Sequence, residues 1–487
     1  MPLRFVRPLI LASACALFSL PLAAQSSSLK NRIVAPVDET QLVTLRGNVH
    51  PMAQARFDRG AAPAATPTGR IVLVLGRSQA QQQALTQYLA DVQNPSSPQF
   101  HQWLTPAQYG AQFGISDGDL QTVESWLQGH GFRIEKVPQG RNILLFSGNF
   151  GQLQSAFHTS IHTLAVNGTT HFGNMSDPQI PAALAPVIAG LGPLNDFHPQ
   201  PTLVRGPTAR YNTATHSIQP TLTLFNGSTP LLFVDPADAA TIYDTPNTKL
   251  NANYKSGTTW DGTGVKIGIA GDSNVNTADV SNYRVAFLNQ ATTSSNIPTV
   301  IVDGDDPGFN GDEVEALLDN EVSGGLAPGA SLYFYTSANT DLTAGLFNAI
   351  FRALDDNTVT ILNISFGACE ADEGQGGNLE ILETAEQAAA QGISVTVSTG
   401  DSGSAGCDND NTETQAQNGL AVNGLASTPY NIAVGGTDYD VLATAFTSYA
   451  SDTTSGAAPY WGTATKYIPE EPWNDSTSIN TNIAANV

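Results

Sequence analysis

Residues 379–401 read LEILETAEQAAAQGISVTVSTGD, and this stretch decides the fold class. Its first part, Leu379 to Ala390, is rich in helix-favouring residues, and the apolar run Ile393 to Ser398 predicts a strand. Similar apolar runs alternate with helical segments through this half of the chain. The other predicted strands are residues 265–270, 299–302, 331–335, 358–364 and 431–434, and the other helices lie near 311–323 and 342–355. Unbroken apolar strands between helices predict an α/β domain with a doubly wound parallel sheet.

Asp401 follows the strand that ends at Ser398, after the turn Thr399-Gly400. Ligand sites in doubly wound sheets lie at the carboxyl ends of strands. A protonated carboxyl at this position can donate a hydrogen bond to a developing oxyanion. Spacing alone favours the simpler interpretation, in which Asp401 caps the next turn.

Glu315 and Asp319 stand four residues apart on the helix predicted near 311–323. At that spacing they lie on one face, with Cβ atoms about 5–6 Å apart. Two acids this close cannot both ionise freely, so one keeps its proton to higher pH, and such a pair can transfer protons. The alternative is a solvated acidic helix face, since Asp312, Glu313 and Glu321 are also present.

The distribution of histidine excludes a Ser-His-Asp triad, which needs a histidine in the catalytic domain. Seven of the eight histidines precede residue 205, and the eighth, His216, lies in a predicted linker. The run Gly400-Asp401-Ser402-Gly403 therefore only imitates the serine signature of trypsin-like enzymes. Nucleotide binding at Gly268 to Gly271 is also rejected, because no phosphate loop with lysine follows.

The N-terminus has the pattern of a secretory signal, predicted over residues 1–24. Two arginines precede an apolar run from Leu9 to Leu22, which is too short for a comfortable membrane span. We therefore expect a secreted protein, extracellular or periplasmic, that is not held in a membrane.

Charge is unevenly distributed along the chain, whose net charge is −23. Residues 1–205 hold 13 of the 20 Lys and Arg but only 10 of the 43 Asp and Glu. The acidic remainder excludes nucleic-acid binding and suits work in acid, where protonated carboxyls relieve self-repulsion. Ordinary solubilising acidity explains the same composition.

The chain divides into a predicted α+β domain over residues 25–196, a linker over 197–235 and the α/β domain over 236–487. We expect residues 26 to about 70 to form an irregular lead-in. Strands and helices then alternate, with Thr105 and Asp117 as helix caps. The linker is rich in Pro, Thr, Asn and Ser and has little periodicity.

Cys369 and Cys407 are the two cysteines that remain once the signal is removed. In an oxidising compartment such a pair is expected to be bridged. Two unpaired buried thiols are the alternative. Metal binding is less favoured, because no histidine lies nearby.

Several motifs, in order, resemble the sedolisin family, the serine-carboxyl peptidases. Glu315 with the run Asp319 to Ala330 resembles the catalytic helix of that family. The other matching segments are Asn363 to Gly367, Ser398 to Gly403, Ala433 to Thr437, and, upstream, Phe100 to Pro106 with Phe113-Gly114, which is similar to the activation prodomain of the kumamolisin-like branch. The resemblance spans about residues 30 to 487.

The resemblance implies a subtilisin-like catalytic domain preceded by a ferredoxin-like prodomain that acts as an intramolecular inhibitor. It implies an acid-acting zymogen whose substrates are proteins or peptides. Glu315 would be the general base, Asp319 would orient it, and Asp401 would form the oxyanion hole. The substrate-lining segment would be Ser365, Phe366 and Gly367.

The chain also departs from the family pattern. The family usually has Trp where Phe366 stands, and Asp272 is the acid near the first strand that would correspond to the family's auxiliary acid. The nucleophile, in a Gly-Thr-Ser motif, is expected after Trp473-Asn474-Asp475, as are the calcium ligands that the family implies.

We interpret Ser455 as a loop serine rather than the nucleophile, because its motif lacks the leading glycine and precedes the Trp-Asn-Asp element. The expectation is thus a C-terminally truncated chain, inactive as it stands. The alternative is a pseudopeptidase that binds peptides or a partner protein without cutting.

Overall fold

The computed structural model describes residues 29–201, 210–212, 217–219, 223–226, 229–232, 234–289, 297–408, 417–439, 441–451 and 460–472. The predicted signal, Ser455 and the Trp473-Asn474-Asp475 element lie outside these residues. Within them, no helix is long and apolar enough to cross a membrane.

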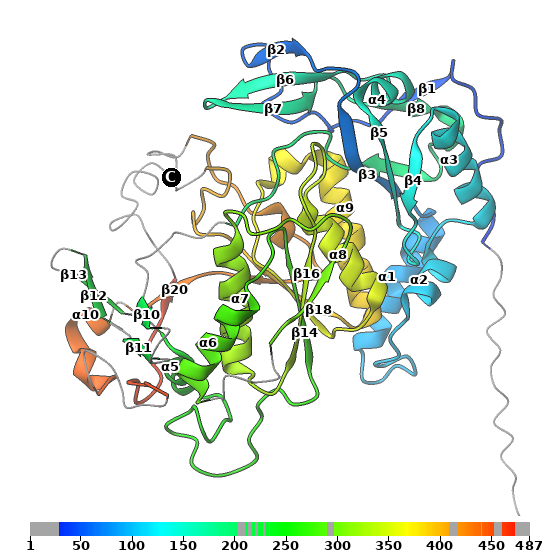
Figure 1. The fold of residues 1–487 in the computed structure, drawn as a ribbon. Helices are drawn as coiled ribbons and strands as arrows, with labels where there is room; N and C mark the ends of the chain where they lie inside the picture. The colour runs from blue at the N-terminus through cyan, green and yellow to red at the C-terminus, as the bar shows by residue number, and fades with distance from the viewer. Residues whose placement is uncertain are drawn as a thin grey trace, which may run out of the picture.

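A six-stranded parallel sheet occupies the centre of the C-terminal region, as predicted (Figure 1). Its strand order is β15-β16-β14-β17-β18-β19. The strands are β14 (Lys266–Gly271), β15 (Thr299–Val302), β16 (Ser331–Thr336), β17 (Ile361–Ile364), β18 (Ser394–Ser398) and β19 (Ile432–Val434). Because later strands add on both sides of β14, the carboxyl ends of β14 and β17 lie at the point where the order reverses, which is where such sheets bind ligands.

Helices cover both faces of this sheet. α6 (Thr277–Leu288) and α7 (Glu313–Leu326) pack on one face over a core that includes Ile269 and Phe334. α8 (Gly345–Asp356) and α9 (Glu370–Gln391) pack on the other. The short helix α5 (Pro236–Ile242) contacts α6 and α7. Helices on both faces explain why the strands are apolar without alternation.

The N-terminal region is an α+β domain with antiparallel sheets. The main sheet has the order β4-β5-β3-β9 and a second has the order β2-β6-β7. The strands are β2 (Asp58–Ala61), β3 (Pro67–Leu75), β4 (Arg133–Lys136), β5 (Ile143–Asn149), β6 (Ile161–Val166), β7 (Thr169–Asn174) and β9 (Ile188–Leu191). The helices are α1 (Gln79–Gln93), α2 (Pro106–Phe113), α3 (Asp117–Gly129) and α4 (Phe150–Phe157).

Strand β3 is buried on both faces, and this joins the two domains. Ile71 and Leu73 face the core of the N-terminal domain, whereas Val72 and Val74 pack into the core that contains α8 and α9. In Figure 1 the blue and cyan N-terminal region accordingly lies against α8 and α9. The guanidinium of Arg77 reaches across this interface and pairs with Glu383 and Glu386 of α9.

Three local predictions are corrected. The lead-in over residues 26 to 70 is not irregular throughout, because β1 (Leu42–Thr44) pairs with β8 (Gln179–Pro181), and β2 and the start of β3 also lie there. The linker contains two short strand pairs, β10 (Arg210–Asn212) with β11 (Ser217–Gln219) and β12 (Thr223–Asn226) with β13 (Thr229–Leu232). Ser116 rather than Asp117 caps α3, since its side chain accepts the backbone N–H of Asp119.

Candidate active site

Helix α7 places Glu315 and Asp319 on the face that packs against the sheet. The two side chains hydrogen-bond each other, and Glu315 is buried, with 5% of its surface exposed. Burial, together with the negative charges of Asp319 and Asp401, raises the pKa of Glu315 to about 8. The acidic run is therefore not simply a solvated helix face: its two inward members form a coupled pair that holds a proton near neutral pH.

The segment that follows β17 fixes the position of this pair. Ser365 Oγ donates a hydrogen bond of 2.7 Å to Oδ1 of Asp319 and accepts one of 3.0 Å from Nδ2 of Asn363. Burial raises the pKa of Asp319 to about 6, while the hydrogen bonds from Ser365 and Asn363 oppose that rise because they stabilise the carboxylate. Ser365 thus ties the helix to the carboxyl end of a central strand.

Asp401 follows the carboxyl end of β18. This is the same edge of the sheet as the carboxyl end of β17, which Ser365 follows. The turn before it requires Gly400, whose φ of 91° is a conformation that favours glycine. The backbone N–H of Thr399 donates to the carbonyl of Val434, which anchors the start of this turn. The charge of Asp401 contributes to the raised pKa of Glu315. The structure therefore places Glu315, Asp319 and Asp401 close enough for their charges to interact.

Asp272 belongs to a second acid pair next to the first. It directly follows β14, is 1% exposed and accepts a hydrogen bond of 2.9 Å from Nδ2 of Asn339. Burial, with the charge of Asp312 at the start of α7, raises its pKa to about 7. Asp272 is therefore coupled to Asp312, three residues before Glu315.

The proposed substrate-lining segment is already paired with another part of the chain. The N–H of Gln200 donates to the carbonyl of Gly367 at 3.0 Å, and the N–H of Gly367 donates to the carbonyl of Gln200 at 2.9 Å. This is an antiparallel β-bridge formed by the segment that leaves the N-terminal domain. Phe366 is 2% exposed and its ring packs in the core, so here it offers only backbone groups to the cleft.

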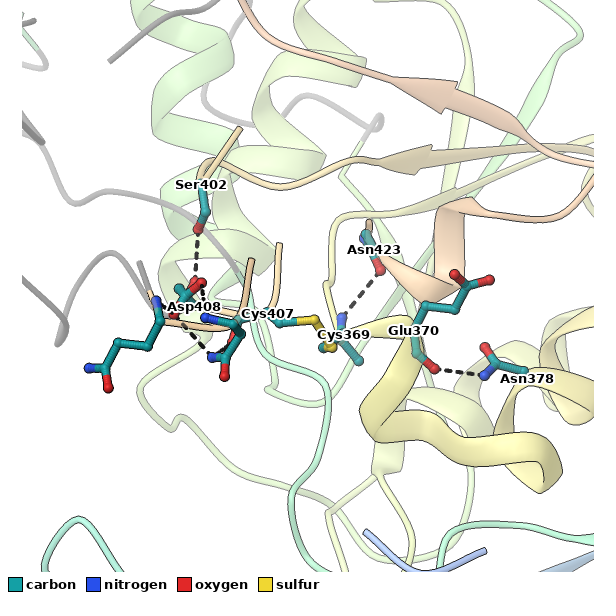
Figure 2. Close-up of a disulfide and its surroundings, with 10 residues drawn as sticks. Cys369, Glu370, Asn378, Ser402, Cys407, Asp408 and Asn423 are labelled. Atoms are coloured by element: carbon teal, nitrogen blue, oxygen red, sulfur yellow. Dashed lines mark hydrogen bonds between the residues drawn. A yellow bond between two sulfur atoms is a disulfide. The ribbon is translucent and has the colours of Figure 1, made fainter. Parts of the chain in front are cut away.

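Cys369 and Cys407 form a disulfide with Cα atoms 4.6 Å apart (Figure 2). It joins the start of α9 to the loop that follows Asp401. Asn423 supports the same region, since Nδ2 donates to the carbonyls of Phe366 and Ser398 and Oδ1 accepts the N–H of Ala368. The segment that follows β17 and the loop bearing Asp401 are thus linked covalently and by hydrogen bonds.

The described residues contain no group of three or more His, Cys, Asp or Glu side chains arranged to hold a metal ion. None of these residues is therefore assigned as a ligand for the calcium ion that the family resemblance implies.

Two family models match this chain. The model of the pro-kumamolisin activation domain matches residues 57–197, and the model of the subtilase family matches residues 299–467. The first match covers most of the antiparallel N-terminal domain, and the second covers the parallel sheet from β15 onward, without β14.

The chain is similar to three characterised relatives. It is 28% identical over 453 residues to sedolisin from Pseudomonas sp. (strain 101), covering 90% of this chain and 71% of that protein. The chain is thus similar to the sedolisin family. It is also 29% identical to xanthomonalisin from Xanthomonas sp. (strain T-22), covering 76% of this chain and 45% of the relative. For kumamolisin from Bacillus sp. (strain MN-32) the identity is 27%, covering 68% of this chain and 55% of the relative.

The match to an activation domain and the similarity to sedolisin together support a proteolytic precursor. The chain spans about half the length of xanthomonalisin and kumamolisin. The activity, substrates and partners of the whole protein are therefore taken up as proposals.

Sequence reasoning missed three features of this site. It assigned Ser365 to substrate binding and did not predict its hydrogen bond to Asp319. It also did not predict the pairing of Gln200 with Gly367 or the coupling of Asp272 to Asp312. The run Asn363 to Gly367 carried the one available signal, since alternate polar residues in a buried strand need partners. The partner itself could not be read from the sequence.

Proposed function

We propose that this chain is the precursor of a secreted, acid-acting serine-carboxyl endopeptidase. The observation that carries this proposal is the coupled pair of Glu315 and Asp319, held by Ser365 within electrostatic reach of Asp401. A carboxylate can replace histidine as general base when a second carboxyl orients it and shares its proton.

In this proposal Glu315 accepts the proton of the nucleophilic serine and Asp319 orients it. Protonated Asp401 donates a hydrogen bond to the oxyanion, which restricts turnover to acid because an ionised Asp401 cannot donate. The substrate lies along the backbone of Ser365, Phe366 and Gly367. The nucleophile belongs to the Gly-Thr-Ser motif that the family resemblance places after Asp475, and Asp272 is an auxiliary acid behind the pair.

The precursor is idle because its cleft is covered and its base holds a proton. Burial is the first cause of the raised pKa of both Glu315 and Asp319. Removal of the N-terminal domain would admit water to the cleft and lower both pKa values, so that Glu315 could act as a base in acid.

Replacing Glu315 by Gln in the complete gene product tests the base assignment. We expect Glu315→Gln to lose acid proteolysis and self-processing. The control Glu313→Gln, two residues earlier in the same helix, should retain both. Retained turnover in Glu315→Gln rejects the assignment. Cleavage of a denatured protein by the 487-residue chain would show instead that the nucleophile lies within these residues.

A further inference from the structure

A cavity of about 170 Å³ lies beside the loop that carries Asp401. Its walls are the strand end at Gly367, the disulfide Cys369–Cys407, the turn at Gly400, and Asn423. Gln200 and Pro201 of the covering segment close the remaining side. The cavity thus lies between the proposed substrate-lining segment and the loop that carries Asp401, and the covering segment borders it.

The covering segment shows how an extended peptide lies in this cleft. Gln200 pairs with Gly367 in an antiparallel bridge. In an extended peptide bound in the same register, the residue two positions after the one that pairs with Gly367 would lie opposite Ser365. Ser365 contacts Asp319, and the loop of Asp401 borders the cavity. With Asp401 as the proposed oxyanion donor, the attacked carbonyl lies at the loop that borders the cavity. The side chain of the residue before the scissile bond then faces the cavity.

Most polar side chains of the cavity wall are occupied by internal hydrogen bonds. The carboxylate of Asp408 accepts the backbone N–H groups of Gln417 and Asn418, at 2.7 and 3.3 Å. Ser402 Oγ donates to the carbonyl of Asp408 at 3.1 Å (Figure 2). Asn423 uses both its oxygen and its amide nitrogen on the backbone, as described above. These groups shape the cavity rather than recognise a ligand.

Asp372 differs from the other polar groups of the wall. It lies in the first turn of α9, is half-buried, and has no cation or hydrogen-bond donor on its carboxylate among the described residues. Among the described residues that line the cavity there is no lysine or arginine. Burial raises the pKa of Asp372 to about 6, because no cation or hydrogen-bond donor among the described residues offsets the loss of water around its carboxylate. An entering cation would supply that compensation and favour the ionised form.

We propose that Asp372 is a specificity-determining residue that selects a lysine or arginine side chain immediately before the scissile bond. The inference rests on the proposed peptidase function. The aliphatic stem of the substrate side chain fills the cavity between Gly367 and the disulfide, and its charged end reaches Asp372. A charge-assisted hydrogen bond of this kind changes affinity by about 10- to 100-fold.

Peptide binding tests this without requiring a nucleophile. The background is the 487-residue chain with Gln200→Pro, which removes the N–H that holds the covering segment on Gly367. Two fluorescent peptides, identical except for a carboxyl-terminal lysine or norleucine, are titrated at pH 7 and followed by anisotropy. We expect the lysine peptide to bind at least about tenfold more tightly. Asp372→Asn should abolish that difference, and the matched control Glu370→Gln, an exposed acid in the same turn, should preserve it.

The outcomes separate the inference from the function on which it rests. Equal binding of the two peptides, or tighter binding of norleucine, overturns the role of Asp372 and makes the cavity an apolar pocket, while leaving the peptidase proposal intact. A lysine preference that survives Asp372→Asn also overturns it. Failure of both peptides to bind contradicts the cleft itself. Circular dichroism of each variant shows that the fold is retained, and cleavage-site mapping with the complete gene product gives a second reading of the same preference.

Discussion

Ser365 Oγ lies 2.7 Å from Oδ1 of Asp319 and joins the end of a central strand to the helix that carries the acid pair. Asp319 in turn hydrogen-bonds Glu315. One hydroxyl therefore controls the position of both carboxyls and the ease with which they lose a proton.

Ser365→Ala should raise the pKa of Asp319 above its present value of about 6, because a hydrogen bond that favours the carboxylate is lost. It should also lower the free energy of unfolding by about 1 kcal/mol. Titration of selectively ¹³C-labelled aspartate by NMR measures the first effect. Ser427→Ala, which removes a hydroxyl from the exposed carboxylate of Glu370, is the control and should leave Asp319 unchanged. An unaltered Asp319 titration contradicts the assigned role of Ser365.

The precursor should be more stable in mild acid than at pH 8. Burial raises the pKa of Glu315 and of Glu373 to about 8, and that of Asp272 to about 7. The folded state therefore binds more protons than the unfolded state, and this stability is complete below about pH 4 and lost as pH rises through the folded pKa values. Each such group contributes up to about 1.4 kcal/mol per pH unit in that window.

Urea unfolding between pH 5 and 8 checks this dependence. Glu373→Gln should flatten the curve, because glutamine keeps the shape of the protonated acid but does not titrate. Stability that increases steadily toward pH 8 would show that these carboxyls are not buried in solution.

Arg77→Met should weaken the contact between the two domains. Its guanidinium is 3% exposed and is the partner of two buried carboxylates, Glu383 and Glu386, so its removal leaves both without their cation. Removing one partner of a buried ion pair costs about 3–5 kcal/mol. The free energy of unfolding and the rate of limited proteolysis at the linker measure the effect. Arg133→Met is the control and should change either quantity little, because the side chain of Arg133 is 76% exposed and its ion pair with Glu135 lies within the N-terminal domain.

Removing the disulfide with the paired changes Cys369→Ser and Cys407→Ser should destabilise the fold by about 3–4 kcal/mol, as the loop-entropy relation gives for the separation of 38 residues. The same change should loosen the loop of Asp401 and the cavity beside it. Urea titration measures the first effect, and hydrogen exchange at Thr399 to Ser402 measures the second. A loss below about 1 kcal/mol with unchanged exchange would mean that hydrogen bonds through Asn423 suffice.

The sequence by itself determined the element types and the chemistry of the helix. The parallel sheet, the helices between its strands and the four-residue spacing of Glu315 and Asp319 all follow from periodicities of the chain, which are local properties.

Only the tertiary structure decided which surfaces meet. Strand β3 is apolar on both faces because a second domain covers one of them, and no local pattern identifies that partner. The contact of Ser365 with Asp319 spans 46 residues, and the pairing of Gln200 with Gly367 joins the linker to the parallel-sheet domain. Such contacts depend on the order of strands in the sheet and on how the domains dock, so the acid pair became a candidate site only when the fold brought a hydroxyl, a second loop and a peptide segment to it.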